Sequence, residues 1–369
     1  MTATAVAILV AAAVGPWLPV MNAGFYLDDE MLIEHARDTP APAALTDAWP
    51  LQTYRPLVTL AFDAMQPFFG SNPRGYHALS IVLHVLNTLL ALALAYRISS
   101  DRLAAVFAAL LFAVLPSHLE AIGWIASVGD LMAAGLLVIT VLTALAAADG
   151  KPPGRIAWTG LSLLSAVAAC SAKESALVVA VLAPASAWFF AKTRPGWRWM
   201  VLHPAVTLAW LAWRSTRAGA PLSLDILAIV GPHISLYMGA KKLLLTVLPV
   251  LRDVADRVLT PTSGWTWLLM TAVWISVVAL VARSASASNR TQLFGWLWML
   301  AALVPVWWLP YQGRFTYLPS VGAALIAAGL LRDLDWRGRP AVAAGLAVLF
   351  LVCLTASAVS PVSWAGGGP

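Results

Sequence analysis

The stretch GYHALSIVLHVLNTLLALALAYR, residues 75–97, decides the fold of this chain. It contains no Asp, Glu or Lys, and its single Arg is the last residue. A helix needs about 20 residues to cross a bilayer core of about 30 Å, so this run is long enough to span a membrane. The composition agrees, since 60% of the 369 residues are hydrophobic and 11% are charged. An ordinary soluble domain does not have this composition, and the sequence predicts an all-α polytopic membrane protein.

Similar apolar runs recur along the whole chain. They predict a single membrane domain, residues 1–369, with eleven crossings at 3–20, 76–97, 103–117, 131–148, 156–172, 175–191, 200–216, 264–282, 292–310, 316–331 and 340–358. Basic residues gather in the loops of one side, namely Arg97, Arg102, Lys151, Arg155, Lys192, Arg194, Arg198, Arg283, Arg290, Arg332, Arg337 and Arg339. Because cytoplasmic loops carry the excess of Lys and Arg, we expect the N-terminus inside and the C-terminus outside. Because these basic residues are distributed over many separate short loops and form no continuous stripe, they do not indicate nucleic-acid binding.

Two long loops are expected on the outer side, at 21–75 and 217–263. In the first, apolar residues at helical spacing predict two short amphipathic helices that lie on the membrane surface. The second contains the apolar stretch 224–250, in which Lys241 and Lys242 are adjacent. We expect this stretch to be a re-entrant or surface-lying helix, because a full crossing would reverse the side of every later basic loop.

The first apolar segment and the cysteines raise two further questions. A cleaved signal peptide is disfavoured for residues 3–20 because no basic residue precedes them, so we expect a retained helix. Cys170 and Cys353 both lie inside apolar segments, which favours neither a disulfide framework nor a cysteine-based metal site.

Asp28 and Asp29 follow the first apolar segment directly, and the stretch YRPL at 54–57 lies in the same loop. A carboxylate there can accept a proton, and the Arg55 guanidinium can hold two phosphate oxygens. Helix capping explains the acid pair as well, with Asp28 as the N-cap and Asp29 in a first turn that favours acids. We expect the roles to divide, with Asp28 as the cap and Asp29 as the base. For Arg55 the alternative is an anchor to lipid headgroups.

A polar stripe runs along the segment 75–97. Its members, His77, Ser80, His84 and Asn87, follow one another at a spacing of three and four residues. This spacing places them on one face of a helix, which we expect to face the interior of the bundle. Interhelical hydrogen bonds account for Ser80 and Asn87. His77, at the outer end of the segment, is a candidate substrate contact.

Three further motifs place charged or aromatic residues at the outer ends of crossings. PSHLEAIGWIASVGD, residues 116–130, contains His118, Glu120 and Asp130; SAKES, residues 171–175, contains Lys173 and Glu174; GRFTYLPSVG, residues 313–322, contains Arg314 and Tyr317. Ser117 followed by Glu120 also fits a helix capping box. Neighbouring residues on a helix point about 100° apart, so we expect Lys173 and Glu174 to reach different partners.

These motifs together resemble a known family. YRPL at 54–57, GYH at 75–77, the LLHVLN-like spacing at 83–87, PSHLEAIGWIASVGD, AKE at 172–174 and RFTYLPSVG at 314–322 occur in the order found in the membrane domain of the TMTC-type protein O-mannosyltransferases and their bacterial relatives, within the GT-C glycosyltransferase superfamily. The resemblance runs over nearly the whole chain and implies a GT-C-like helical bundle. The tetratricopeptide repeats that usually follow the membrane part in that family do not occur within residues 1–369.

The resemblance implies an inverting glycosyltransferase. Such enzymes move a sugar, here with mannose as a candidate, from a polyprenyl-phosphate-linked donor to a hydroxyl of a protein or glycan acceptor on the outer face. By this likeness Asp29 or Asp28 is the general base. Candidate ligands of the donor phosphate are Arg55, Lys173, Arg314, Lys241 and Lys242, and candidate sugar or acceptor contacts are His77, His118, Glu120, Asp130, Glu174 and Tyr317. The expected location is a bacterial inner membrane, with the site facing the periplasm or the cell exterior.

No cofactor is required by this chemistry, and no metal site is predicted. If a Mg or Mn ion takes part, Asp28, Asp29 and Glu120 are the carboxylates that would hold it. The expected partners are the lipid-linked donor, the acceptor and membrane lipids, without nucleic acid. The alternative function is a transporter or flippase of a lipid-linked glycan, which would also place charged residues in a bundle cavity.

Overall fold

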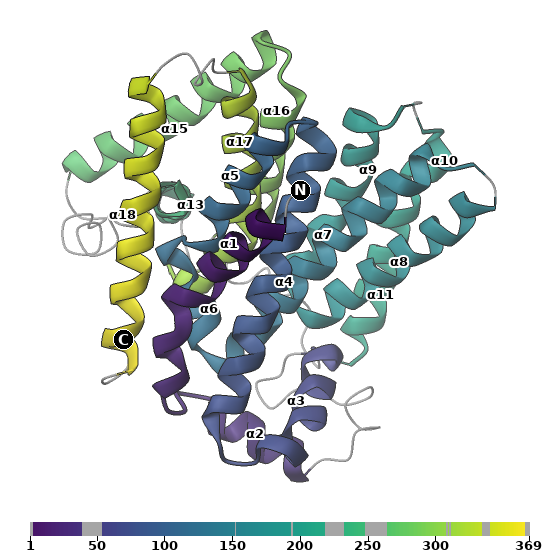
Figure 1. Cartoon of the computed structure of the whole chain (residues 1–369). Helices are drawn as coiled ribbons and strands as arrows, with labels where there is room; N and C mark the ends of the chain where they lie inside the picture. Colours follow the sequence, from purple (N-terminus) through teal and green to yellow (C-terminus); the bar gives the residue numbers. More distant parts are fainter. Residues whose placement is uncertain are drawn as a thin grey trace.

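The computed structural model describes residues 3–38, 54–151, 153–192, 195–217, 232–247, 264–307, 309, 311–333 and 340–365. These residues form helices joined by short turns, and they include no strand (Figure 1). The elements are α1 Ala3–Val14, η1 Gly15–Asn22, α2 Asp29–Asp38, α3 Pro56–Phe69, α4 Pro73–Ser99, α5 Arg102–Ala113, η3 Pro116–His118, α6 Leu119–Gly123, η4 Ile125–Ser127, α7 Val128–Asp149, α8 Gly154–Ala172, η5 Glu174–Val178, α9 Val179–Phe190, α10 Trp197–Met200, α11 Leu202–Ser215, α13 Pro232–Val247, α15 Gly264–Ser286, α16 Arg290–Leu303, η7 Val304–Val306, η8 Gly313–Thr316, α17 Tyr317–Asp333 and α18 Pro340–Ala365.

The prediction of an all-α polytopic membrane protein is confirmed. Every predicted crossing coincides with a helix, and among the described residues six helices are long and apolar enough to cross a bilayer. The bent pair Arg102–Ala113 and Pro116–Gly123, with an angle of 49° between its halves, makes a seventh if it counts as one span. The predicted count of eleven is not confirmed, because helices such as α11 and α16, each of 14 residues, are shorter than the bilayer core requires.

Both expected helices of the first outer loop are present as α2 and α3. On α2, Leu32 and Ile33 are buried while Glu30 and Glu34 are exposed, as an amphipathic helix requires. The part of this loop at 39–53 lies outside the described residues. In the second outer loop, α13 occupies the middle of the stretch 224–250, and the flanking parts of that stretch lie outside the described residues as well.

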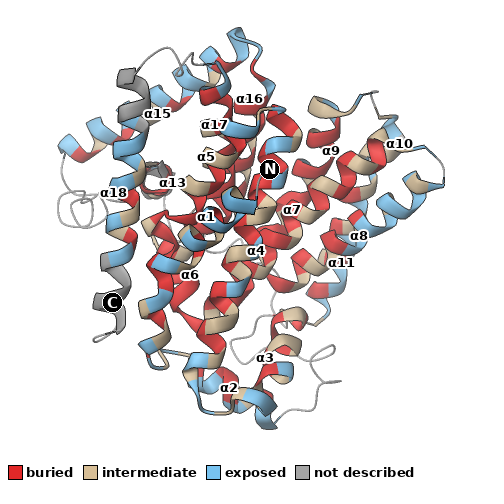
Figure 2. Ribbon diagram, in the orientation of Figure 1, coloured by how far each residue is buried: buried red, intermediate tan, exposed pale blue. Residues whose placement is uncertain are grey.

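Helix α7 lies in the middle of the bundle and is buried along most of its length (Figure 2). Helices α16 and α17 approach one another so closely that small residues are needed between them. A Cβ atom added to Gly322 would lie 2.6 Å from the Gly295 carbonyl oxygen, well inside van der Waals contact. This pair carries the turn η8 at its end, so its packing sets the position of Arg314.

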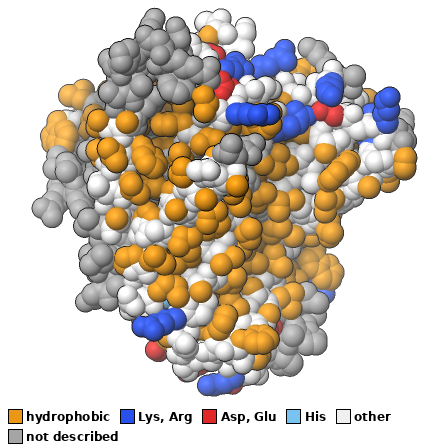
Figure 3. All heavy atoms as spheres, viewed as in Figure 1, with side chains coloured by type: hydrophobic (Ala, Val, Ile, Leu, Met, Phe, Trp, Pro, Cys, Tyr) orange, Lys and Arg blue, Asp and Glu red, His pale blue; other side chains and the backbone are white. Residues whose placement is uncertain are grey.

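The surface divides into a hydrophobic band and two polar ends. In Figure 3 Lys and Arg side chains gather at the end of the molecule opposite α2 and α3, and apolar side chains cover the face between the two ends. Helices suit such a band because they satisfy their own main-chain hydrogen bonds in lipid. The described chain is therefore an integral membrane protein with two chemically different ends.

Candidate functional site

The acid pair begins the helix α2 at the end of the bundle where α2 and α3 lie. Leu27 adopts the left-handed region at φ 50°, which turns the chain from η1 into α2. Asp29 is fully buried, and its carboxylate accepts hydrogen bonds from Tyr26 N at 2.9 Å and from Ala126 N at 2.8 Å. Burial raises the pKa of Asp29 to about 7, although the main-chain hydrogen bonds act in the opposite direction. Asp29 thus joins α2 to the turn η4.

Asp28 is half-buried and has a different environment. Its Oδ1 accepts a hydrogen bond from Trp124 Nε1 at 3.1 Å, while its carbonyl oxygen accepts from Leu32 N at 3.1 Å. Asp28 therefore has the position of an N-cap, but its side chain points to Trp124. Asp29, the residue expected to act as the base, is the enclosed one of the two, whereas Asp28 is half-buried. The partners responsible, Trp124 and Ala126, are almost a hundred residues away along the chain, so local spacing could not reveal them.

Arg314 lies over the Trp124 ring, whose edge donates to Asp28. Its guanidinium carbon is 4.0 Å from the centre of the indole ring, which is a cation–π contact, and its Nε donates to Gln312 Oε1 at 2.9 Å. Within the described residues, no carboxylate forms an ion pair with Arg314. Asp28, Trp124 and Arg314 thus form a row of acid, ring and cation in which the cation still has the capacity to bind an anion.

Two groups of ion pairs complete the site. Lys173, in the break between α8 and η5, pairs with Asp130 at the start of α7, and its ammonium lies 5.5 Å from the Phe315 ring. Glu174 pairs with Arg55 at 2.9 Å and with Arg214 at 3.1 Å. The prediction that Lys173 and Glu174 reach different partners is confirmed. Burial lowers the pKa of Lys173 to about 8, with Asp130 opposing the shift.

These side chains belong to one electrostatic cluster. Arg55 interacts through space with Asp28 and Asp130, and Lys173 interacts with Arg55 and Arg314. The cluster combines residues from the loop before α3, from the breaks beside α7 and η5, and from η8. We call it the outer cluster, with the members Asp28, Asp29, Arg55, Asp130, Lys173, Glu174, Arg214 and Arg314. Sequence reasoning missed Arg214, whose only local signal is a basic residue in the last turn of the apolar helix α11.

The predicted sugar or acceptor contacts on α4 and α17 lie deeper in the bundle. Tyr317 is fully buried, and its hydroxyl lies 2.9 Å from His84 Nδ1 and 3.1 Å from Asn87 Nδ2. His118 Nε2 lies 2.8 Å from Ser320 Oγ, and the His118 ring is 4.4 Å from that of Tyr317. The polar stripe therefore faces the interior, as expected. Asn87 makes the expected interhelical hydrogen bonds, whereas the prediction for Ser80 is wrong, because its Oγ is buried without a partner.

His77 is also fully buried at the outer end of α4. Its Nε2 lies 3.2 Å from the Ala23 carbonyl oxygen, which ties α4 to the end of η1. Its Nδ1 is buried without a hydrogen-bond partner. The structure thus places His77 between two helical segments.

Glu120, Lys241 and Lys242 all contact the segment around residue 310. Glu120 accepts a hydrogen bond from Gly313 N, so it fixes the turn η8 that carries Arg314. The alternative capping box does not form, since Ser117 Oγ has no partner. Lys242 is fully buried and donates to the carbonyl oxygens of Trp307 and Leu309, at 3.1 and 2.6 Å. The Lys241 ammonium lies 6.0 Å from the Tyr311 ring.

A metal site does not assemble from the described residues. No three side chains among their His, Cys, Asp and Glu residues come close enough to hold an ion. Asp28 and Asp29 direct their carboxylates to Trp124 and to main-chain amides, and Glu120 directs its own to Gly313. These three acids are therefore engaged separately.

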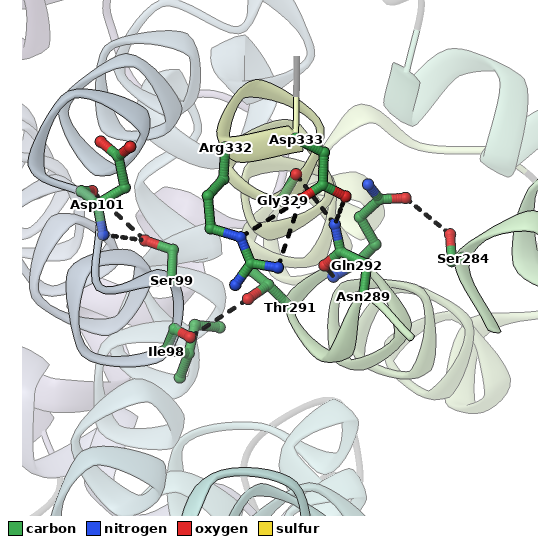
Figure 4. A network of polar contacts seen from close by, with 10 residues as sticks. All are labelled: Ile98, Ser99, Asp101, Ser284, Asn289, Thr291, Gln292, Gly329, Arg332 and Asp333. Atoms are coloured by element: carbon green, nitrogen blue, oxygen red, sulfur yellow. Dashed lines mark hydrogen bonds and ion pairs between the residues drawn. The ribbon is translucent and has the colours of Figure 1, made fainter. Parts of the chain in front are cut away.

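The opposite end of the bundle carries a second polar network, centred on Asn289 (Figure 4). Asn289 Nδ2 donates to the Gly329 carbonyl oxygen at 3.1 Å and to Asp333, and its Oδ1 accepts from Gln292 N at 3.0 Å. Other bonds of this inner network join Thr291 to Ile98, Gln292 to Ser284, and Arg332 to Asp333. The inner network ties α4, α15, α16 and α17 together.

Comparison with known proteins gives a consistent set of partial matches. The chain is 28% identical over 179 residues to Protein O-mannosyl-transferase Tmtc1 of Drosophila melanogaster, covering 45% of this chain and 20% of that protein. It is 37% identical over 93 residues to human Protein O-mannosyl-transferase TMTC1, a match that covers 25% of this chain and 10% of that protein. It is 30% identical over 152 residues to mouse Protein O-mannosyl-transferase TMTC2, a match that covers 37% of this chain and 18% of that protein.

The matched part spans no more than a fifth of the length of these curated relatives. No family model matches the chain, and no solved structure does. These matches confirm the resemblance to the TMTC-type enzymes that the motifs indicate, over 25% to 45% of this chain.

Proposed function

We propose that this chain is a membrane glycosyltransferase that transfers a sugar, with mannose as the first candidate, from a polyprenyl-phosphate-linked donor to an acceptor hydroxyl at the outer cluster. Similarity to proteins named O-mannosyl-transferases supports the class of reaction. The acceptor is a protein or glycan hydroxyl, and the membrane is a bacterial inner membrane with the outer cluster facing the periplasm or the cell exterior. The concentration of Lys and Arg at the other end of the bundle supports this orientation.

The observation that carries the proposal is the row Asp28, Trp124 and Arg314. Transfer with inversion needs a base directed at the acceptor hydroxyl and a cation directed at the departing phosphate. Asp28 is half-buried, in contrast to the enclosed Asp29, and Arg314 is a cation without an acidic partner in the described chain. Trp124 contacts both, so the two reactive groups are held on one rigid ring.

We assign the base to Asp28 and a positioning role to Asp29. A pKa near 7 would suit Asp29 as a base, but access comes before pKa, and both of its oxygens receive main-chain amides in a fully buried setting. By fixing η4 to α2, Asp29 holds Trp124 and Asp28 in register.

The transfer then proceeds in one displacement. Asp28 takes the proton of the acceptor hydroxyl, the acceptor oxygen bonds to the anomeric carbon, and the bond from that carbon to the donor phosphate oxygen breaks. The phosphodiester monoanion becomes a phosphate monoester with one further negative charge, while Asp28 becomes neutral. Arg314 binds this developing charge, with Lys173 and Arg55 beside it.

The proposal is tested by transfer from labelled polyprenyl-phosphate mannose to a serine- and threonine-containing peptide, with purified full-length protein. Wild-type protein should form labelled glycopeptide, whereas Asp28→Asn should keep the wild-type melting temperature and form none. Asp333→Asn, from the opposite end, is the matched control and should remain active. Transfer by Asp28→Asn at the wild-type rate would rule out the base assignment.

The same preparation separates the enzyme from a flippase. In proteoliposomes, a flippase would move labelled polyprenyl-phosphate mannose across the bilayer without any acceptor peptide, and Asp28→Asn would not necessarily stop that movement. An enzyme requires the acceptor and releases polyprenyl phosphate in equal amount to glycopeptide. Adding a chelator to the reaction tests a Mg or Mn requirement, and we expect no loss of transfer.

A further inference from the structure

A groove of about 290 Å³ lies between α4 and α5. We call it the α4–α5 groove, and the residues that line it are Leu89, Leu92, Ala93, Tyr96, Arg102 and Ala105. The four residues from α4 stand at positions i, i+3, i+4 and i+7, so they share one face of that helix. From Leu89 to Tyr96 this face covers about 10 Å, because a helix rises by about 1.5 Å per residue. The groove therefore runs lengthwise between the two helices.

The two ends of the α4–α5 groove differ in chemistry. Helix α4 begins beside α3, so Tyr96 and Arg102 lie toward the opposite end of the bundle, where Lys and Arg side chains gather (Figures 1 and 3). Tyr96 is 45% exposed, and Arg102 is exposed as well. Tyr is typical of the membrane interface, where its ring lies among apolar groups and its hydroxyl reaches water. The remaining lining residues carry only hydrocarbon side chains, so the groove has an apolar length and a polar mouth.

The polar groups at this mouth still have donors to offer. Among the described residues, Arg102 has no ion pair and its side chain makes no hydrogen bond, and the Tyr96 hydroxyl makes none either. The nearby acids are engaged elsewhere. Asp101 Oδ1 accepts from two main-chain amides in the first turn of α5, at 2.8 and 3.0 Å, and Asp149 pairs with Arg97. The mouth therefore presents a guanidinium and a hydroxyl that can both donate to an anion.

We propose that the α4–α5 groove binds one anionic phospholipid from the leaflet at the basic end of the bundle. An acyl chain lies along the apolar lining, and the phosphate contacts Arg102, with the Tyr96 hydroxyl as a second donor. Charge favours this occupant over a second copy of the chain, because a copy inserted in the same orientation would bring its own basic end beside Arg102. The groove and the outer cluster lie at opposite ends, so this site does not depend on glycosyl transfer.

The first experiment measures thermal stabilisation of the purified full-length protein, in a neutral detergent, by phosphatidylglycerol and by phosphatidylcholine with identical acyl chains. Phosphatidylglycerol should raise the melting temperature at the lower concentration, because a ligand that binds only the folded state stabilises it. Arg102→Gln should increase the phosphatidylglycerol concentration for half of the effect by about fivefold, equivalent to about 1 kcal/mol for one basic residue near the membrane surface. Its response to phosphatidylcholine should stay as in the wild type. An unchanged phosphatidylglycerol response in Arg102→Gln would overturn the proposal.

A second variant tests the apolar part of the site. Ala93 is exposed, so Ala93→Phe places a ring in the groove without enlarging a residue of the core, and it should weaken the response to both lipids. The matched controls are Arg155→Gln and Ala157→Phe, which change an exposed cation and an exposed alanine near the start of α8, at the same basic end. Both should respond as the wild type does. If Arg155→Gln reduces the phosphatidylglycerol preference as much as Arg102→Gln, the charge of the whole end recruits the lipid and the proposal is wrong.

Native mass spectrometry of the same preparations identifies the occupant. The wild type should retain one more molecule of phosphatidylglycerol than Arg102→Gln and Ala93→Phe do, and the two controls should retain as many as the wild type. Equal retention of phosphatidylglycerol and phosphatidylcholine by the wild type would contradict a contact between Arg102 and the phosphate. A protein dimer that retains no phosphatidylglycerol and dissociates in Ala93→Phe would make a second copy the occupant, and the proposal would fail.

Discussion

The outer cluster and the inner network are built from similar residues but differ in how their charges are matched. In the inner network, Arg332 pairs with Asp333, and Asn289 uses both its donor and its acceptor on neighbouring helices. In the outer cluster, Glu174 is shared by two arginines, and Arg314 contacts two aromatic rings and a neutral amide but no acid within the described residues. The inner network closes its polar groups on itself, and the outer cluster leaves Arg314 without an acidic partner among the described residues.

This difference assigns different tasks to the two ends. A network whose members satisfy one another adds rigidity and has nothing left to offer a ligand. Unmatched buried charge is costly for a fold on its own, so it is typical of sites that gain their partner on binding. We therefore expect substitutions at the outer cluster to change transfer and substitutions at the inner network to change stability.

The largest loss of transfer is expected for Asp28→Asn in the outer cluster, with Asp333→Asn in the inner network as the comparison. Asp28→Asn should lower transfer by about 10²- to 10⁴-fold, the usual contribution of a general base. Asp333→Asn keeps its hydrogen-bonding shape at the inner end and should leave transfer unchanged. Turnover under saturating donor and acceptor is the measurement. Equal losses in both variants would mean that the two ends are not functionally distinct.

The next effect separates two arginines. Arg314→Gln should raise the KM for the polyprenyl-phosphate donor by about thirtyfold, since a lost hydrogen bond to a charged group is worth about 2 kcal/mol. Arg332→Gln should leave KM as it is, because Asp333 and not a ligand is its partner. Initial rates over a range of donor concentrations give both values. If Arg314→Gln lowers kcat and leaves KM unchanged, Arg314 stabilises the transition state and not the bound donor.

Much of this contrast could be read from the sequence, and the rest depends on contacts between distant segments. Each apolar run coincides with a helix, and the split of Lys173 from Glu174 followed from helical geometry. The exposure of Asp28 instead of Asp29 depends on Trp124 and Ala126. The role of Glu120 depends in the same way on Gly313, which is 193 positions away. Local periodicity carries no information about such contacts, so the division of labour within the site was out of reach.

A third and smaller effect concerns pH, through Asp29. Because its pKa is raised from 3.8 to about 7, the folded state holds this proton more tightly than the unfolded state does. Its contribution to stability is therefore fully present below pH 3.8 and is lost as the pH rises through about 7. Ionisation across the same range places negative charge beside Asp28, so transfer should increase several-fold from pH 6 to pH 8.

Asp29→Asn has no such titration and provides the control. As the pH rises from 6 to 8, the melting temperature of Asp29→Asn should increase relative to that of the wild type. Its transfer rate should change less with pH over that range. Thermal melts and transfer assays at matched ionic strength measure the two quantities. If the transfer rate of Asp29→Asn depends on pH as steeply as that of the wild type, the titrating group is not Asp29.

The smallest effect on transfer is expected at the centre of the inner network. Asn289→Ala removes the cap of α16 and leaves the Gly329 carbonyl oxygen and the Gln292 amide without their partner, so the free energy of unfolding should fall by about 2 kcal/mol. Transfer per folded molecule should stay at the wild-type level, because Asn289 touches no member of the outer cluster. Denaturant melts together with turnover of the folded fraction separate the two quantities. A loss of turnover at unchanged stability would show that the inner network communicates with η8 through α17, and the two ends would then be one functional unit.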